Sequence, residues 1–351
     1  MKYIIIICIL IFIIFNRHIR EKFTSYTLCE KKKLGSITKE IFSKHNINKN
    51  NGKFDLYIPC GYNSVERELE GLDIKNKKIY AIKGCDRIVS KNNLWVILET
   101  LYGREKAKEI MVETYLYNSN DLELFKKQFN GESYILKNNK QRKKGITISN
   151  NLREILTKNN NKLIQQFKHS FIINNRKFNL RMYLLVICKQ NKKNIYVHDN
   201  TKCLYTSKNY EQDNTDFDSN ITNSYNTSLD IYKNSPFSLT ELYKYLENDH
   251  DVEPLKEKID TLVSRLSKAI TIPLCNLDKL KTNTSFQLFG VDIIIDRDLT
   301  PFILEINKGP DMIPKDHRDR KFKQKVIEDM FHKLGIIKTQ PQNLFKRINT
   351  E

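Results

Sequence analysis

Two apolar runs on either side of a polar break constrain the fold of this 351-residue chain more than any other feature. The runs cover residues 291–295 and 302–306, and the residues between them are typical of a turn. A turn centred on residues 298–299 predicts an antiparallel hairpin. Its apolar face is built from three cross-strand pairs: Val291 with Ile306, Ile293 with Leu304, and Ile295 with Phe302.

The opposite face of this hairpin carries oxygen ligands. In the same register Asp292 lies across from Glu305, and Asn307, two residues further along, shares their face. Two neighbouring carboxylates repel each other unless a cation lies between them. Mg²⁺ takes one or two carboxylates, keeps several waters and is completed by substrate phosphates. The sequence therefore predicts a magnesium site at these three residues. The alternative is an ordinary hairpin with solvated acids.

Further motifs stand upstream of the hairpin in a fixed order, and together they resemble the tubulin–tyrosine ligase-like family. This is an ATP-grasp group that joins amino acids to protein carboxylates. The motifs resemble, in turn, a P-E-T-F motif, a phosphate-lysine strand with its glycine loop, an adenine hinge, a K-F-D-I-R strand and an H-L-T-N motif. They lie at residues 113–115, 134–137 with 143–146, 163–167, 176–186 and 220–223.

The resemblance implies an α/β (α+β) chain with an ATP-grasp fold and a smaller N-terminal α/β domain. A stripe of apolar residues three and four apart, from Leu255 to Ile270, predicts a helix within it. With the composition of each segment, five parts are expected. They are a hydrophobic anchor and basic flank at 1–22, a polar tether at 23–52, the N-terminal α/β domain at 53–130, the ATP-grasp ligase region at 131–340 and a tail at 341–351.

The resemblance also implies which residues bind ATP and Mg²⁺. Mg²⁺ would be held by Asp292, Glu305 and Asn307, while Arg181 and Glu305 would be catalytic. An arginine within an apolar strand has to meet a carboxylate or a phosphate. The resemblance implies the γ-phosphate and acyl phosphate for Arg181, and a structural ion pair is the alternative. The nucleotide would contact eight residues: Lys137, Gly145, Gln165, Gln166, Phe167, Lys177, Asn179 and Arg181.

Three positions depart from the family's motifs. Asn179 stands where the family has an aspartate, and a neutral amide should bind a ribose hydroxyl less tightly. The family's acceptor-side arginine aligns near Leu204; Lys202 or Lys208 can substitute, although a lysine lacks the bidentate fork. Asn220 replaces the histidine of the H-L-T-N motif. Nucleotide and metal positions are retained while acceptor and amino-acid positions vary, so the transferred amino acid stays open.

The formal charge of +19 predicts an acidic partner. No nucleic-acid motif accompanies the charge, so we expect an acidic protein acceptor, tubulin or another acidic tail, rather than nucleic acid. The second substrate is a free amino acid, and we expect the chain to act as a monomer. A compositional bias toward lysine and asparagine is the alternative explanation of the charge.

Seven cysteines are scattered along the chain, odd in number and never spaced as C-x-x-C. This spacing argues against a disulfide framework or a zinc site and predicts reduced thiols. Cys188 lies within an apolar segment, where we expect it to be buried as a small hydrophobic side chain.

An uninterrupted apolar run covers residues 3–15. It is shorter than the ~20 residues of a comfortable membrane span, although snorkelling of Lys2 and Arg17 would let a thin bilayer accept it. No small-residue cleavage site follows, and basic residues concentrate after the run. The positive-inside rule then predicts a membrane-anchored chain with its body on the cytoplasmic side. A buried strand is the alternative.

Three functions are compatible with these features. The one we favour is an ATP- and Mg²⁺-dependent ligase that activates a carboxylate as an acyl phosphate and joins an amino acid to an acidic protein acceptor. Phosphoryl transfer of this kind depends on positioning and charge neutralisation rather than on a protein nucleophile. The alternatives are ATP-grasp ligation of a small-molecule carboxylate, and an inactive nucleotide-binding module that docks on acidic tails.

Overall fold

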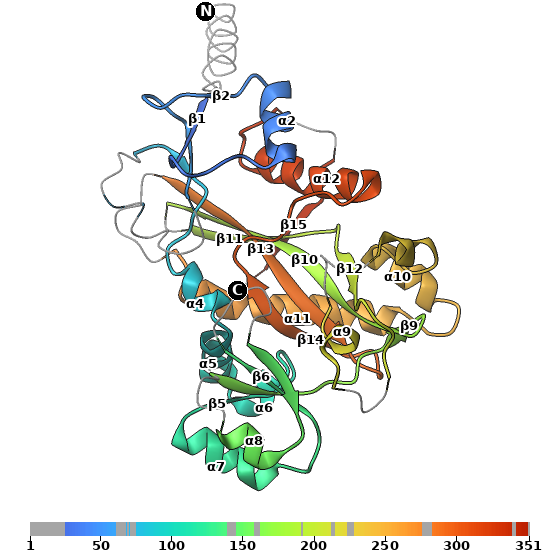
Figure 1. Cartoon of the computed structure of the whole chain (residues 1–351). Coiled ribbons are helices and arrows are strands. Elements are labelled where there is room, and N and C mark those ends of the chain that lie inside the picture. The colour runs from blue at the N-terminus through green and yellow to red at the C-terminus, as the bar shows by residue number, and fades with distance from the viewer. Residues whose placement is uncertain are drawn as a thin grey trace, which may run out of the picture.

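The structure is a computed structural model that describes residues 25–60, 68, 70, 75–138, 145–157, 162–190, 192–211, 215–222, 228–275, 283–338 and 342–349. Within these residues the chain forms two β-sheets with helices packed around them, a large sheet across the middle and a small sheet below it (Figure 1). The mixed α/β class predicted from the sequence is confirmed. The arrangement fits an ATP-grasp-like fold.

Two long antiparallel strands form the centre of the large sheet. β10 (Arg176–Lys189) pairs with β13 (Thr284–Ile295), and β14 (Pro301–Asn307) pairs with the other edge of β13. The strand order is β15-β11-β10-β13-β4-β3-β1-β2, with β14 beside β13 and with β9 and β12 beside β10. The remaining strands are β1 (Ser25–Leu28), β2 (Asn48–Lys49), β3 (Leu56–Ile58), β4 (Lys78–Ile79), β9 (Ile172–Ile173), β11 (Lys192–His198), β12 (Lys202–Tyr205) and β15 (Phe345–Ile348).

Helices cover both faces of the large sheet, because its central strands bury side chains on both sides. Leu184 and Val186 of β10 belong to a core shared with α11 (Glu253–Thr271), and the stripe predicted there is confirmed as buried packing. Tyr183 and Leu185 belong to the opposite core, with α2 (Ser36–Lys44) and α12 (His317–Lys333). The other helices are α4 (Cys85–Val89), α5 (Lys91–Tyr102), α6 (Arg104–Lys108), α9 (Phe217–Asn220), the 3-10 helix η1 (Leu229–Lys233) and α10 (Leu239–Leu246).

The small sheet is antiparallel and has its own core. Its order is β5-β8-β6-β7, with β5 at Thr114–Leu116, β6 at Tyr134–Lys137, β7 at Ile146–Ser149 and β8 at Leu163–Gln166. Two helices, α7 (Ser119–Gln128) and α8 (Leu152–Thr157), pack on it around the buried ring of Phe125. Backbone hydrogen bonds from Ile303 to Ile110 and from Val112 to Ile303 join this unit to β14 (2.8 and 3.3 Å). The sheets are thereby fixed close to each other.

The N-terminal segments differ from the predicted domain plan. Residues 23–52 were expected to form a polar tether, yet α2 buries Ile37, Ile41 and Phe42 against α12. These three apolar residues lie on one side of the helix, and their burial offsets the cost of ordering a polar segment. The segment predicted as an N-terminal domain is divided as well, because β3 and β4 join the large sheet while β5 joins the small one.

Two disulfides correct the prediction of reduced thiols. Cys29 pairs with Cys60, and Cys188 pairs with Cys275, with Cα–Cα distances of 5.1 and 5.7 Å. Spacing along the chain did not predict these pairs, because the tertiary structure joins segments that are 31 and 87 residues apart. Cys85 and Cys203 are buried and take part in neither disulfide, and Cys188 is largely buried as expected.

The membrane prediction also needs correction. The apolar run at residues 3–15 lies outside the described residues. Among the residues that are described, no helix combines the length and the apolar composition that a bilayer crossing requires. This finding contradicts the predicted membrane-anchored placement with a cytoplasmic body, and we abandon that prediction.

Candidate active site

The hairpin of β13 and β14 brings the predicted metal ligands together. The predicted pairing of Asp292 with Glu305 is confirmed, as is that of Val291 with Ile306. Beyond them the register shifts by one residue at a β-bulge, so Ile293 pairs with Ile303, and Leu304 is the extra residue. The predicted pairs of Ile293 with Leu304 and Ile295 with Phe302 are therefore wrong. Asn307, which pairs with Gly290, remains on the side of the carboxylates.

Arg181 reaches this carboxylate group from the neighbouring strand. In the pairing of β10 with β13 it lies directly opposite Asp292. Its Nη2 donates to Asp292 Oδ2 at 2.9 Å, and its Nε donates to Oδ1, which makes a bidentate pair. Gly290 provides the room, because a Cβ there would lie 2.9 Å from Arg181 Cδ. Sequence reasoning missed this glycine, although a glycine inside an apolar strand commonly marks a close approach.

The Asn307 amide joins the two acids. Its Nδ2 donates to Asp292 Oδ2 at 3.1 Å and to Glu305 Oε1 at 3.4 Å. A half-turn of the amide presents its oxygen to the same point. Two carboxylates and one amide oxygen are the hard donors that Mg²⁺ prefers. The three residues therefore fit a magnesium ion bound at this face of the hairpin.

Positive charges from three other elements surround Glu305. Lys91, the first residue of α5, forms an ion pair with Glu305 Oε2 at 3.5 Å. Burial alone would raise the pKa of Glu305, but Lys91, Lys137 and Arg181 together lower it. Burial raises the pKa of Asp292, and its neighbour Glu305 adds to this against the opposing effect of Arg181. The acids are thus close enough for the ionisation of one to disfavour that of the other.

Lys137 stands at the end of β6, where the small sheet approaches the metal ligands. It is buried, and its Nζ donates to Gln165 Oε1 at 2.6 Å. Burial lowers the pKa of Lys137 to about 8, although the charges of Glu305 and Asp292 oppose the shift. Gln165 is fixed in turn, because its Nε2 donates to Thr114 Oγ1 at 3.2 Å. An anion close to this ammonium would raise its pKa again and give it a stronger partner than the neutral amide of Gln165.

Lys177 lies at the other end of the predicted nucleotide site. Its Nζ is 3.9 Å from the centre of the Phe167 ring and 5.2 Å from that of Tyr210. It donates to Asn220 Oδ1 at 3.4 Å, so the residue that replaces the family's histidine contacts a predicted nucleotide lysine. Burial lowers the pKa of Lys177 to about 7. Lys177 therefore makes cation–π contacts with two aromatic rings of the protein.

The rest of the predicted nucleotide contacts are only partly brought together. Asn179 Nδ2 donates to Thr222 Oγ1 at 3.0 Å, so its amide has a partner within the protein. The backbone N–H groups of Gln166 and Phe167 donate to Glu113 and Ser133, which removes them as adenine donors. Gly145 has a φ of +78°, and a Cβ there would overlap the Asn138 side chain. Residues 139–144 of the predicted phosphate loop, and residue 223, lie outside the described residues.

A basic cavity opens on the side of Arg181 that faces α12. Its volume is about 30 Å³, which is room for roughly two waters. Leu204 lines it where the family's arginine was expected, and of the two candidate replacements Lys202 lines it whereas exposed Lys208 pairs with Asp216. The full lining is Arg181, Tyr183, Lys202, Leu204, Tyr205, Leu229, Tyr232, Asp311, Lys315 and Lys323.

The wall of this cavity carries a buried cluster with excess positive charge. Asp319 accepts from Lys202 at 2.6 Å and forms an ion pair with Lys323 at 2.9 Å. Two ammonium groups thus share one carboxylate. Burial would raise the pKa of Asp319, but the two lysines lower it. Neither Asp319 nor Lys323 was predicted as a site residue, because their sequence context is that of an ordinary basic helix.

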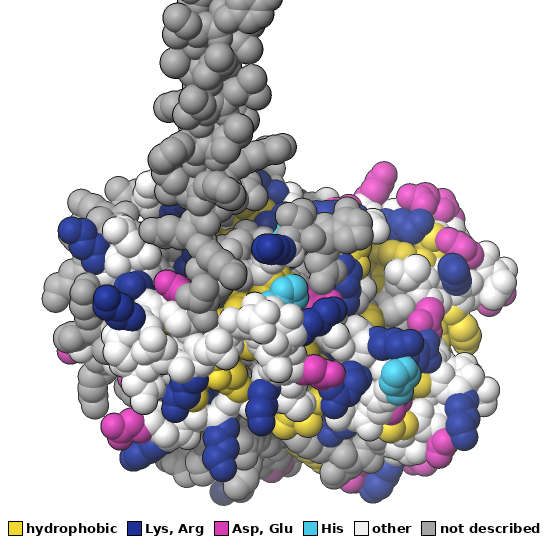
Figure 2. Space-filling view, turned by 90° about the horizontal axis from the view of Figure 1, so that it is seen from above, with side chains coloured by type: hydrophobic (Ala, Val, Ile, Leu, Met, Phe, Trp, Pro, Cys, Tyr) yellow, Lys and Arg dark blue, Asp and Glu magenta, His cyan; other side chains and the backbone are white. Residues whose placement is uncertain are grey.

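The overall charge is distributed more evenly than this local cluster suggests. Figure 2 shows lysine and arginine side chains dispersed over the face that carries α2 and α12, without one continuous patch. On α12, Arg318 and Arg320 form ion pairs with Glu241 and Glu40. The surface charge of this face therefore points to no single binding place. The cavity is the more specific feature.

Comparisons with known proteins agree with the geometry. The Tubulin-tyrosine ligase family matches residues 72–343 of the chain. The probable tubulin polyglutamylase TTLL9 of Bos taurus is 28% identical over 117 residues, 30% of this chain and 24% of that protein. The tubulin polyglutamylase TTLL5 of Homo sapiens is 28% identical over 111 residues, 30% of this chain and 8% of the relative. The probable tubulin polyglutamylase TTLL2 of Mus musculus is 32% identical over 101 residues, 28% of this chain and 17% of that protein. The matches span less than a quarter of these relatives' lengths.

Proposed function

The chain belongs to the tubulin-tyrosine ligase family, and we propose that it is an ATP- and Mg²⁺-dependent ligase with an ATP-grasp fold that joins an amino acid to an acidic protein acceptor. The observation that carries this proposal is the convergence of Arg181, Asp292 and Glu305 on three adjacent strands, with Lys91 and Lys137 directed at the same acids. Ordinary packing gives no reason for two carboxylates and three cations to converge at one buried point.

Each residue of this group has a role in the proposed reaction. ATP would supply the phosphoryl group that turns a carboxylate into an acyl phosphate, with Mg²⁺ held by Asp292, Glu305 and Asn307. Lys137 and Lys91 would bind phosphate oxygens, and Lys177 would lie beside the adenine. Arg181 would neutralise the charge that develops on the transferred group, because its fork already lies beside the metal ligands.

The cavity beside Arg181 supports the acidic character of the acceptor. Lys202, Lys315 and Lys323 line it together with Asp311, and Asp319 behind the lining pairs with both Lys202 and Lys323. Its enclosed part has about the size of one carboxylate group. We propose that a carboxylate of the acceptor's acidic segment binds there. The relatives named tubulin polyglutamylases make tubulin the first acceptor, and glutamate the first amino acid, to be tested.

One alternative has a specific observation in its favour. The acceptor side lacks the family's arginine, with Leu204 lining the cavity near that position. A chain that binds ATP and docks on acidic tails without ligating them would tolerate this change. Both functions would use the retained metal ligands to bind Mg²⁺ with ATP, so the formation of a ligated product decides between them.

An assay with defined substrates tests the proposal. The full chain is incubated with ATP, Mg²⁺, one labelled amino acid at a time, and either tubulin or a synthetic glutamate-rich peptide. We expect ATP-dependent label in the acceptor with at least one amino acid. ATP binding without label in any acceptor would favour the docking module. Label only in small molecules would favour the small-molecule ligase.

A further inference from the structure

A second group of potential ligands lies far from the proposed active site, at the N-terminal edge of the large sheet. Cys29 directly follows β1, and Cys60 lies two residues beyond β3. The two strands are parallel neighbours, with Leu28 paired with Ile58, and the N–H of Cys29 donates to the Ile58 carbonyl at 3.1 Å. The backbone therefore holds the two cysteines side by side whether or not their sulfurs are bonded.

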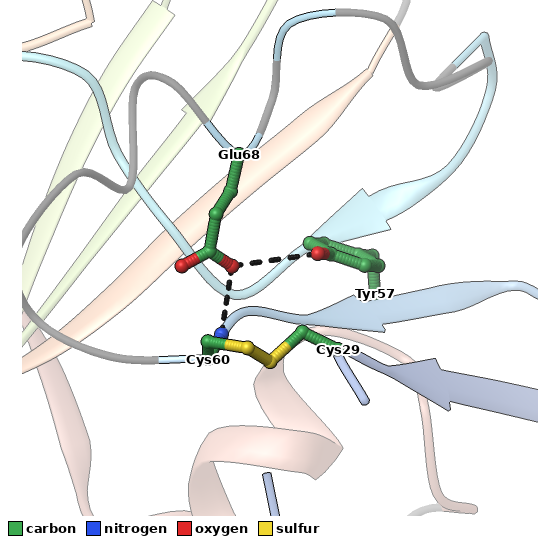
Figure 3. The surroundings of a disulfide bond; sticks show 4 residues. All are labelled: Cys29, Tyr57, Cys60 and Glu68. Atoms are coloured by element: carbon green, nitrogen blue, oxygen red, sulfur yellow. Dashed lines mark hydrogen bonds between the residues drawn. A yellow bond between two sulfur atoms is a disulfide. The ribbon is translucent and has the colours of Figure 1, made fainter. Parts of the chain in front are cut away.

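Glu68 completes this group. Its Oε2 accepts from the backbone N–H of Cys60 at 2.7 Å and from the Tyr57 hydroxyl at 3.4 Å, which places its carboxylate beside the disulfide (Figure 3). Two donors thus orient the carboxylate of Glu68, in the way that hydrogen-bonding partners commonly orient a metal ligand.

The ligand atoms of Cys29, Cys60 and Glu68 all lie within 4.8 Å of one another in a half-buried setting. In a tetrahedral zinc site with Zn–S bonds of ~2.3 Å, neighbouring ligand atoms are roughly 3.3–3.8 Å apart. Small side-chain rotations bring the three atoms to that separation. Among the residues that the structure describes, no other set of three cysteine, histidine or acidic ligands meets the same distance condition.

We propose that Cys29, Cys60 and Glu68 form a redox-dependent site for a zinc-type divalent cation, with a water in the fourth position. In the oxidised protein the disulfide occupies both sulfurs. Two thiols of a reductant supply two electrons and two protons and leave as a disulfide, which cleaves the S–S bond of the protein into two thiols. In vitro a phosphine supplies the two electrons and leaves as the phosphine oxide, while water supplies the two protons and the oxygen. The cation then displaces both thiol protons and binds two thiolates and the carboxylate. The disulfide and the metal ion are thus alternative links between the ends of β1 and β3. This inference does not depend on the proposed ligase activity.

The charge balance favours a divalent cation over a bare dithiol. Two thiolates and one carboxylate carry three negative charges, and a divalent ion leaves a single negative charge. The three lysines at positions 31–33 follow Cys29 almost directly in the chain. Soft thiolates select zinc-type ions over Mg²⁺, so this site does not compete for the Mg²⁺ of the hairpin.

Cobalt(II) is a suitable probe, because thiolate–cobalt bonds give absorption bands that neither partner shows alone. The full chain is reduced with a phosphine, freed of excess reductant without air, and titrated with Co²⁺ and then with Zn²⁺. We expect one Co²⁺ per chain in a thiolate-ligated tetrahedral site, displaced by Zn²⁺, and no such spectrum for the oxidised protein. A reduced protein without thiolate–cobalt bands, or an oxidised protein with the same bands, would overturn the proposal.

Matched variants separate this site from the other cysteines. Cys29→Ser and Glu68→Gln should each weaken Co²⁺ binding by about 10- to 100-fold or more. Cys188→Ser removes the other disulfide and should leave Co²⁺ binding unchanged. Circular dichroism identifies any variant that fails to fold, and Cys60→Ser replaces it in that case. Binding that survives in Cys29→Ser, or that is lost only in Cys188→Ser, would exclude the site; unchanged binding in Glu68→Gln would exclude the three-ligand assignment.

Discussion

The nucleotide and acceptor sides of the candidate active site meet at Arg181, and they are built in opposite ways. On the nucleotide side each charge has a partner inside the protein: Arg181 with Asp292, Lys91 with Glu305, and Lys137 with Gln165. On the acceptor side Lys202 and Lys323 share the single carboxylate of Asp319, and the same cavity is also lined by Lys315 and Asp311.

This difference indicates what each side has to recognise. Paired charges keep a fixed geometry, which suits a nucleotide and a metal ion whose shapes never vary. An excess of cations around a small cavity attracts negative charge with less demand on shape, which suits a flexible acidic segment. The departures from the family's motifs at Leu204 and Asn220 accompany this division only in part, because Asn220 contacts Lys177 on the nucleotide side.

The largest effect is expected at the metal ligands. Glu305→Gln should reduce ligation to below about 1% of wild type, because losing a first ligand costs more than the 10- to 100-fold typical of outer partners. The exposed variant Glu247→Gln is the matched control and should retain activity. Initial rates at saturating ATP, with circular dichroism to verify folding, provide the measurement. Near-normal ligation by folded Glu305→Gln would remove Glu305 from the metal site.

The second-largest effect is expected at Lys137, the lysine proposed to bind phosphate. Lys137→Met keeps roughly the length of the side chain and removes its charge. The variant loses a charged hydrogen bond to phosphate, which contributes ~1.5–3 kcal/mol, so ATP affinity should fall by about 10- to 100-fold. Affinity for the acceptor should change little, since Lys137 does not line the basic cavity. Calorimetric titration with ATP and, separately, with a glutamate-rich peptide tests both sides. An equal loss of affinity for ATP and for the peptide would contradict the separation of the nucleotide side from the acceptor side.

The low pKa of Lys137 predicts opposite pH trends for binding and stability. Above its pKa of about 8 the free protein holds a neutral lysine, so ATP affinity should fall about tenfold per pH unit until the loss equals that of Lys137→Met. Between about 8 and the ordinary value of 10.5 the unfolded chain binds more protons than the folded chain, so this residue makes stability rise with pH. ATP titrations and urea denaturation across this range, in wild type and Lys137→Met, measure both trends. ATP affinity that is flat across pH 8 in wild type would exclude the lysine as a phosphate ligand.

The smallest effect is expected on the acceptor side. Lys315→Glu should raise the acceptor KM about fivefold, since a partly exposed charge contributes up to about 1 kcal/mol, and should leave the KM for ATP unchanged. Added salt should raise the acceptor KM in the same way, because the Debye length is only ~8 Å at physiological ionic strength. Lys39→Glu, at an exposed position of α2, is the control for net charge alone. An equal effect of both reversals would mean that overall charge, and not the cavity, attracts the acceptor.

Local pattern was sufficient to predict the hairpin, and it failed where distant segments meet. The alternation of apolar and acidic residues placed Asp292 opposite Glu305, but a one-residue bulge at Leu304 is invisible to a period of two. The buried positions Ile37, Ile41 and Phe42 already have helical spacing, so a search for periodicity would have found α2 inside the supposed tether.

Contacts between segments that are distant in the sequence could not be predicted from local sequence patterns. The cysteine pairs, the contact of Lys137 with Gln165 and the cluster around Asp319 each join elements that only the tertiary structure brings together. The family resemblance named Lys137 and Gln165 without indicating that they bond. It gave no information on Lys323, because this residue and most of the cavity lining lie outside the motifs.

The fate of a carboxylate oxygen tests the central proposal most directly. A glutamate-rich acceptor peptide labelled with ¹⁸O in its carboxylates is incubated with the full chain, ATP, Mg²⁺ and the amino acid that supports ligation. An acyl phosphate intermediate transfers one labelled oxygen to inorganic phosphate for each amide bond formed, and Glu305→Gln should abolish both products together. Amide formation that leaves the phosphate unlabelled would contradict the proposed mechanism.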